Sequence, residues 1–153
     1  MSLSASTIHI AQADHLATIT RLKEEGFEMC ADLCAVDYSA HPGRVLADGV
    51  DGQRFEVVVN LLSLSQRRRI RVRTQVSGDD PTVDSITGVY PGADAMEREA
   101  FDLLGVRFAG HPDLSRILLP DEWEGHPLRK DFPVANVPIQ FKAPDRARGA
   151  GGR

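Results

Sequence analysis

Two adjacent stretches near the middle of the chain restrict the fold more than any other feature. Residues 54–64 are β-branched and almost continuously apolar, which predicts a central strand buried on both faces. Residues 69–76 alternate strictly, which predicts a second strand. The alternation places Ile70, Val72 and Thr74 on one face and Arg69, Arg71 and Arg73 on the other. Because residues 65–68 allow only a tight connection, we predict a β-hairpin.

The pattern before the hairpin predicts a helix followed by a strand. Over residues 13–25, apolar side chains recur at spacings of three: Leu16, Ile19 and Leu22. Asp14 is placed to begin this helix and Gly26 to end it. Alternation over 27–38 predicts a strand, most clearly in its first part, and the Pro-, Gly- and Asp-rich residues 41–53 predict a loop.

A second helix is predicted after Tyr90-Pro91-Gly92. Its apolar face consists of Met96, Ala100, Leu103 and Leu104. Arg98 and Asp102 are four residues apart, so we expect them to pair on another face. Gly105 occupies the position of a left-handed C-cap. Residues 106–108 then form a short apolar strand candidate, and 82–86 either another short strand or the approach to the helix.

The C-terminal third differs in composition from the rest. Residues 111–133 carry four prolines, two histidines and the chain's one tryptophan without helical or strand periodicity. Apolar residues alternate with charges: Leu114, Ile117, Leu118, Leu119, Trp123, Leu128 and Phe132. A long irregular segment in a small domain is usually functional, and prolines lower the entropy lost on ordering it.

These elements predict an α+β fold, with a small, mostly antiparallel sheet, helices packed on one face and an extended Pro-rich C-terminal strap. We divide the chain into a core domain (1–110), a partner-binding strap (111–141) and a disordered tail (142–153). The length of 153 residues suits one domain.

Charge and hydropathy exclude some classes of function. The net charge of −4 and pI of about 5.7 disfavour nucleic acid as the main partner. The arginines of 67–73 are then a solvated or partner-facing side of the hairpin. No apolar run approaches the roughly 20 residues of a membrane span, and the N-terminus lacks a signal-peptide pattern. We therefore expect a cytosolic chain that meets the membrane only through partners.

The sequence contains no recognisable self-contained active site. Cys30 and Cys34 lack a second pair to complete an iron–sulfur or zinc site, and we expect both to be buried apolar groups. His111 and His126 match no zinc-ligand spacing, so we expect structural hydrogen bonds from both. Glu97 and Glu99 point in different directions on a helix and cannot share one substrate proton.

Residues 97–133 closely resemble the signature of the 30 kDa subunit family of respiratory NADH:quinone oxidoreductase, complex I. The matching blocks are Glu97-Arg98-Glu99, Asp102-Leu103, Gly105-Val106, Phe108, Gly110-His111-Pro112-Asp113-Leu114, Arg116-Ile117-Leu118, Pro120, Trp123 and Glu124-Gly125-His126-Pro127-Leu128-Arg129-Lys130-Asp131-Phe132-Pro133.

The resemblance implies a non-catalytic peripheral-arm subunit that packs against the large quinone-site subunit, near the iron–sulfur subunits. It implies that FMN, iron–sulfur clusters and quinone are held by other subunits, and that NADH oxidation coupled to quinone reduction and proton translocation belongs to the assembly. The expected interface residues are Glu97, Arg98, Glu99, Asp102, His111, Pro112, Asp113, Arg116, Trp123, His126, Arg129, Lys130 and Asp131. The resemblance places the chain peripherally at the cytoplasmic face of the cell membrane.

Two alternatives stay open at this point. Related subunits occur in membrane-bound hydrogenases and in deazaflavin-dependent dehydrogenases, which this chain's sequence cannot easily separate from the respiratory enzyme. The chain could instead be an independent enzyme or a nucleic-acid-binding domain. A concave site with shifted titratable groups, and a strap folded onto its own core beneath a closed surface, would favour that alternative.

Overall fold

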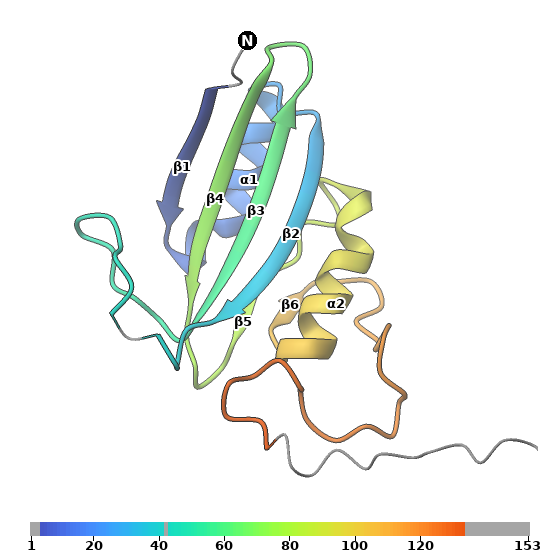
Figure 1. Cartoon of the computed structure of the whole chain (residues 1–153). Helices are drawn as coiled ribbons and strands as arrows, with labels where there is room; N and C mark the ends of the chain where they lie inside the picture. The colour runs from blue at the N-terminus through green and yellow to red at the C-terminus, as the bar shows by residue number, and fades with distance from the viewer. Residues whose placement is uncertain (1–3, 42, 134–153) are drawn as a thin grey trace, which may run out of the picture.

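The computed structural model describes residues 4–41 and 43–133, which form an α+β fold. Four strands make one sheet in the order β1-β4-β3-β2, with β1 parallel to β4 and the other two pairings antiparallel (Figure 1). The elements are β1 (Ser4–Ile10), α1 (His15–Glu24), β2 (Met29–Asp37), β3 (Phe55–Ser63), β4 (Arg68–Val76), β5 (Thr82–Asp84), α2 (Asp94–Leu104) and β6 (Arg107–Ala109). The predicted fold class, with a mostly antiparallel sheet, is confirmed.

The hairpin β3–β4 is the centre of the sheet. Its register runs from Phe55 opposite Val76 to Ser63 opposite Arg68, as the alternation predicts. One face of β3 is buried, but on the other face Val58, Asn60 and Leu62 are partly exposed. The prediction that this strand is buried on both faces is therefore wrong, because both helices of the described chain lie on the same side of the sheet (Figure 1).

The first helix lies on one face of the sheet, within the connection that joins the two edge strands (Figure 1). β1 and β2 are parallel edge strands, and α1 connects them across the face where Ile19 and Leu22 join the core. β1 was not predicted, although Ile8 and Ile10 alternate with polar residues and both pack against the core. Two apolar residues are a weak signal, so the pairing with β4 decides the conformation of this stretch.

The ends of the first two elements differ in detail from the predictions. A short 3-10 turn (Gln12–Asp14) precedes α1, and Asp14 makes no side-chain capping bond. Gly26 has a φ of +93°, as expected after a helix end. In β2 the register shifts between Cys30 and Asp32, and this bulge leaves Ala31 exposed.

α2 extends the hydrophobic core towards the C-terminal part of the chain. Ala100 and Leu104 are buried among the core residues that α1 and the sheet also supply, and Met96 and Leu103 are partly exposed. The short strands β5 and β6 pair in parallel, which fixes Val83 beside Phe108. In the part of the chain that the structure describes, no helix is long and apolar enough to cross a membrane.

A buried histidine joins α1 to the sheet. The Nδ1 atom of His15 lies 2.8 Å from Thr74 Oγ1, and the side chain is fully buried. Burial lowers the pKa of His15 to about 4, because the charged imidazolium would lose its hydration. The neutral ring is therefore the form that the folded chain accommodates.

This burial predicts a pH-dependent difference between the wild type and His15→Asn. As pH falls from about 6.5 to about 4, the unfolded chain takes up a proton that the folded chain resists, so the wild type loses stability. The Asn variant lacks this titration, and its stability relative to the wild type should rise by on the order of 3 kcal/mol across the window. Urea unfolding at several pH values measures the difference. The exposed His41→Asn variant is the control, and a pH-independent difference for His15→Asn would contradict the argument.

Candidate interaction site

Residues 111–133, which we call the strap, contain turns and bends in place of helix or strand. The strap follows α2, passes beyond its C-terminal end and returns towards the ends of β2 and β3 (Figure 1). The remainder of the predicted strap (134–141) and the predicted tail (142–153) lie outside the described residues.

The carboxylate of Asp102 is the main attachment point for the strap. The side chain is fully buried, and its Oδ2 accepts three consecutive backbone N–H groups, from Ile117 (3.1 Å), Leu118 (2.8 Å) and Leu119 (2.9 Å). Arg116 Nη1 donates to the other oxygen at 2.6 Å. Burial disfavours ionisation, but these donors outweigh it and lower the pKa of Asp102 to about 2.

The predicted pair between Arg98 and Asp102 is wrong. Arg98 donates to the carbonyl of Ser115 (3.1 Å), its hydroxyl (3.0 Å) and the carbonyl of Arg116 (3.0 Å). Both members of the expected pair therefore bind the strap. A surface pair along one helix contributes only about 0.3–0.5 kcal/mol, so the buried contacts to the strap prevail.

The strap also satisfies the carbonyl groups at the end of α2. His126 Nδ1 lies 2.9 Å from the Asp102 carbonyl, the Leu128 N–H donates to the Leu103 carbonyl at 3.0 Å, and Arg129 Nε donates to the Leu104 carbonyl at 2.7 Å. These are groups that a helix cannot pair internally, and the positive charge of Arg129 suits this negative end of the helix dipole.

Gly105 makes this close approach possible. It ends α2 with a φ of +71°, as predicted. A Cβ at this position would lie 2.5 Å from both Arg129 Nη2 and His126 Cδ2. The glycine is therefore required for the helix end and for the passage of the strap over it.

A third attachment returns the strap to the sheet. Arg54 Nη2 lies 2.9 Å from Asp37 Oδ2 and 2.8 Å from Asp131 Oδ1, and the Lys130 N–H donates to Asp37 at 3.0 Å. Burial disfavours charge on Asp37, but hydrogen bonds from Arg54, Ser39 and Lys130 outweigh it and lower its pKa. Neither Asp37 nor Arg54 was predicted as a functional residue. The one indication that the sequence gives for them is a charge at the end of an apolar strand.

His111 holds the beginning of the strap against α2. Its Nδ1 accepts the Asp113 N–H at 3.1 Å, which leaves a donor at Nε2, 3.3 Å from the Asp94 carbonyl and 4.0 Å from Glu97 Oε2. Structural hydrogen bonding by His111 and His126 is thus confirmed. Within 4–41 and 43–133, no group of three His, Cys, Asp or Glu is placed to hold a metal ion.

Glu97 is directed into the core and Glu99 to solvent, as the helical spacing predicts. The Glu97 carboxylate accepts hydrogen bonds from Ile86 N and Ser85 Oγ, both at 2.7 Å. Burial raises the pKa of Glu97 despite these bonds. Its contacts tie α2 to the segment that follows β5.

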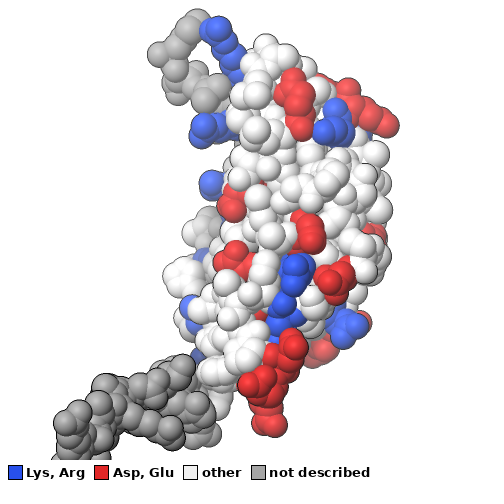
Figure 2. Space-filling view, turned by 90° about the vertical axis from the view of Figure 1, so that its right-hand side faces the viewer, with Lys and Arg blue, Asp and Glu red and all other residues white. Residues whose placement is uncertain are grey.

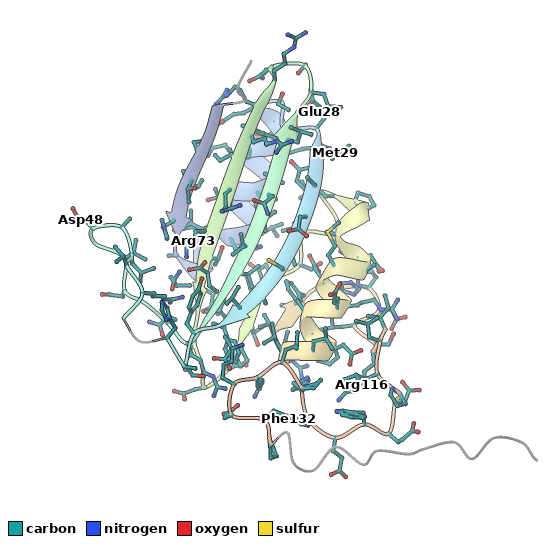
Figure 3. The ribbon with its side chains drawn as sticks, viewed as in Figure 1. Glu28, Met29, Asp48, Arg73, Arg116 and Phe132 are labelled. Atoms are coloured by element: carbon teal, nitrogen blue, oxygen red, sulfur yellow. The ribbon has the colours of Figure 1, made fainter. Side chains whose placement is uncertain are left out.

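The outer side of the strap carries exposed apolar side chains beside charged ones such as Asp121, Glu122 and Glu124. Ile117, Leu118 and Leu128 have 40%, 61% and 52% of their surface exposed, although their backbone N–H groups are bound to the core. Trp123 is half-buried, and its Nε1 is buried without a hydrogen-bond partner among the described residues. Figure 3 shows Arg116 and Phe132 on this strap, beyond the end of α2.

The expected interface residues therefore divide into two groups. Those that hold the strap or α2 in place are Glu97, Arg98, Asp102, His111, Arg116, His126 and Arg129. Those exposed to solvent are Glu99, Pro112, Asp113, Lys130 and Asp131, with Trp123 intermediate. Contact with a partner stays a prediction for both groups.

The arginine side of the hairpin is paired within the sheet. Arg73 Nε donates to Glu56 at 2.6 Å, and Arg71 Nε donates to Asn60 at 3.0 Å. Glu56 is fully buried and also accepts a hydrogen bond from Gln75. Arg71 is nevertheless exposed, so this face keeps a basic, solvated side. Neither cysteine is buried as predicted, because Cys34 is exposed and Cys30 is intermediate on the edge strand β2.

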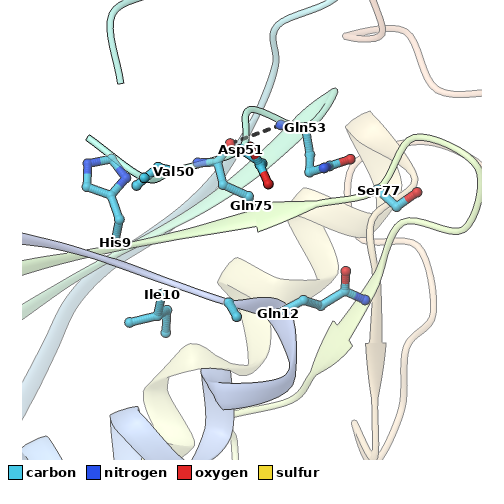
Figure 4. Close-up of a pocket in the computed structure, with 10 residues that line it drawn as sticks. His9, Ile10, Gln12, Val50, Asp51, Gln53, Gln75 and Ser77 are labelled. Atoms are coloured by element: carbon cyan, nitrogen blue, oxygen red, sulfur yellow. Dashed lines mark hydrogen bonds between the residues drawn. The ribbon is translucent and has the colours of Figure 1, made fainter. Parts of the chain in front are cut away.

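A polar hollow of about 500 Å³ lies between the end of β1 and residues 49–53 (Figure 4). His9, Asp51 and Gln75 are among its lining residues, and Gln53 N donates to Gln75 Oε1 at 3.2 Å. None of the strap residues lines it. The hollow is therefore separate from the site that the strap forms.

Comparison with known proteins gives one consistent family. The family model described as "Respiratory-chain NADH dehydrogenase, 30 Kd subunit" matches residues 8–137. The chain is 42% identical to an NADH-quinone oxidoreductase subunit of Salinispora arenicola, covering 93% of this chain but only 58% of that relative. It is 45% identical to the counterpart of that subunit in Dechloromonas aromatica, covering 97% of this chain and 74% of the relative.

Two solved structures resemble the fold. A trypsin-resistant fragment of Nqo5 is 30% identical, with a TM-score of 0.63 over 70% of this chain and 80% of that one. A chain of the archaeal membrane-bound sulfane sulfur reductase is 23% identical, with a TM-score of 0.73 over 96% of this chain and 84% of that one. The second likeness extends to the fold alone.

We expect Asp102→Asn to loosen the strap and destabilise the fold. The amide keeps the volume but replaces a charged acceptor of strap N–H groups with a neutral one and places a donor next to Arg116. The expected loss is about 3 kcal/mol in urea unfolding at neutral pH, with faster proteolysis within the strap. The wild-type advantage should shrink as pH falls from about 3.8 towards 2, because the unfolded chain then takes up a proton on Asp102 that the folded chain resists.

Glu99→Gln, on the same helix but exposed, is the matched control and should stay within about 0.5 kcal/mol of wild type. Equal stability of Asp102→Asn and Glu99→Gln would show that the strap does not depend on this carboxylate.

Proposed function

This chain belongs to the family of the 30 kDa subunit of respiratory-chain NADH dehydrogenase, and we propose that it is a non-catalytic peripheral-arm subunit of an NADH:quinone oxidoreductase. The chain spans just over half the length of the Salinispora relative, so the activity of the whole enzyme is part of this proposal. Its own contribution is to order neighbouring subunits.

The observation that carries the proposal is the orientation of the strap. Its backbone and its arginine and histidine side chains are bound to α2 and the sheet, while Ile117, Leu118 and Leu128 face solvent. An ordered segment that presents apolar side chains loses little entropy on binding, and central apolar anchors supply most of the energy of an interface. The strap is therefore suited to bind another protein.

We assign the quinone-site subunit as the chief partner, with the iron–sulfur subunits nearby. FMN, iron–sulfur clusters and quinone would be held by those neighbouring subunits, and this chain would keep the quinone pocket and the clusters in fixed positions. It would lie peripherally, at the cytoplasmic face of the membrane, with proton translocation performed by the assembly.

The alternatives receive less support. The relatives at 40–48% identity are named as subunits of NADH-quinone oxidoreductase, which favours the respiratory enzyme over a hydrogenase or a deazaflavin-dependent dehydrogenase. The strap folds onto the core of its own chain, which an independent domain would also require. An independent domain would in addition bury its large apolar side chains, whereas those of the strap are exposed.

The proposal predicts that Leu118→Ser together with Ile117→Ser impairs assembly without unfolding the chain. Both side chains are exposed, so their loss should change the free energy of unfolding by less than about 1 kcal/mol. If each of the two side chains contributes about 1 kcal/mol or more to the binding of a partner, the recovery of tagged chain in the complex should fall roughly tenfold or more. Quantitative mass spectrometry of purified membranes and NADH:quinone activity measure this.

The control is Val45→Ser, which removes a side chain that is 92% exposed in the loop before β3. If the strap variant assembled fully and supported normal electron flow, the strap would not be part of the interface, and the proposal would be wrong.

A further inference from the structure

β2 is an edge strand whose outer side is unoccupied by any other strand of the described chain. Its inner side pairs with β3 along most of its length, and the sheet ends there. Because β2 has no second neighbouring strand, alternate residues of β2 direct their backbone N–H and C=O groups away from β3. Edge strands with free backbone groups are sites where an extended segment of another chain can add.

A small groove follows this edge, between β2 and α2. Its apolar lining comes from Leu33 on β2, from Ala100, Leu103 and Leu104 on α2, and from Leu128 of the strap. The groove has a volume of about 190 Å³, below the range of roughly 300–1,000 Å³ for small-molecule pockets. It is of a size to receive a side-chain anchor.

The rim of the groove is acidic on both walls. Asp32 on β2 and Glu99 on α2 are exposed and line the groove, and neither forms an ion pair within the described residues, although Asp32 Oδ2 accepts a hydrogen bond from Asn60 Nδ2 at 3.3 Å. Although Cys34 as a residue is exposed, partial burial of its thiol raises the pKa of that group; the negative charges of Asp32 and Glu99 raise it further, and Arg71 opposes them. Figure 2, which views this side of the molecule, shows acidic groups, with basic groups among them, around uncharged surface.

The groove is continuous with the outer side of the strap. Leu128 lines the groove and is 52% exposed, and its backbone N–H is fixed to the Leu103 carbonyl at 3.0 Å. A partner bound over Leu128 would therefore also reach the groove.

We propose that this groove receives an extended segment of a neighbouring subunit, laid along β2, with an apolar side chain in the groove and a Lys or Arg beside it. The apolar floor selects the anchor, the negative charges of Asp32 and Glu99 select the basic residue, and the free edge selects an extended backbone. The inference rests on the proposed function, because the segment belongs to the same assembly, but it concerns a surface distinct from the apolar side chains at 117 and 118.

Site-specific photo-crosslinking in the intact complex tests the proposal. A benzoylphenylalanine at Met96, which lines the groove, should crosslink to a peptide of another subunit in which an apolar residue neighbours Lys or Arg. The same probe at Leu118 reports on the strap, and at Val45 it serves as the control.

The outcomes separate the two proposals. A crosslink from Leu118 but none from Met96 would overturn the groove proposal and leave the proposed function standing. If neither probe gave a crosslink and the chain were absent from the complex, both the groove proposal and the proposed function would be overturned. A Met96 crosslink to an acidic segment would also overturn the stated chemistry.

Charge reversal gives a second readout that does not alter the core. Asp32→Lys with Glu99→Lys should lower recovery in the complex roughly tenfold at low salt, with a smaller effect at high salt, because rim charges act through screened electrostatics. Glu24→Lys with Asp48→Lys makes the same change in net charge at exposed positions away from the groove, and should have no such effect. Equal recovery of the two double variants would overturn the proposal.

Discussion

The path of the strap depends on the hydrogen bonds that one buried carboxylate in α2, that of Asp102, accepts. A charge removed from water is stable only when donors surround it, and here three successive backbone N–H groups and Arg116 supply them. Those donors all come from one short stretch of the strap. The chain can therefore satisfy the buried charge only by passing residues 116–119 across the last turn of α2, which fixes the path of the residues that follow.

The other attachments use backbone carbonyls that the end of α2 leaves unpaired and charged side chains at the ends of sheet strands. A helix ends with free carbonyls, and the strap crosses that end with Arg129, His126 and the Leu128 N–H in position to bind them. Arg54 then links the strap to the sheet through Asp37 and Asp131. An irregular segment is thus held as firmly as a regular element, because its hydrogen bonds go to other parts of the chain.

The sequence predicts the parts of this arrangement that depend on local pattern. The hairpin follows from the alternation around Val72, and the end of α2 from Gly105. The contacts that attach the strap to α2 and the sheet cannot be predicted from the sequence, because backbone N–H groups such as that of Leu118 carry no residue-specific signal. Arg54 and Asp131 are 77 residues apart, beyond the reach of any periodicity. Asp102 has its expected spacing to Arg98, but burial against the strap decides its partner.

The strap attaches to the core through polar groups and leaves three large apolar side chains exposed, which links the stability of the strap to its binding. If the attachments were absent, a partner would have to order about twenty residues on binding, at roughly 1–2 kcal/mol each for the backbone alone. No interface of ordinary size could offset that and still bind tightly. The buried charges and capped carbonyls supply the ordering within the folded chain, so the free energy of burying Ile117, Leu118 and Leu128 against a partner remains available for binding.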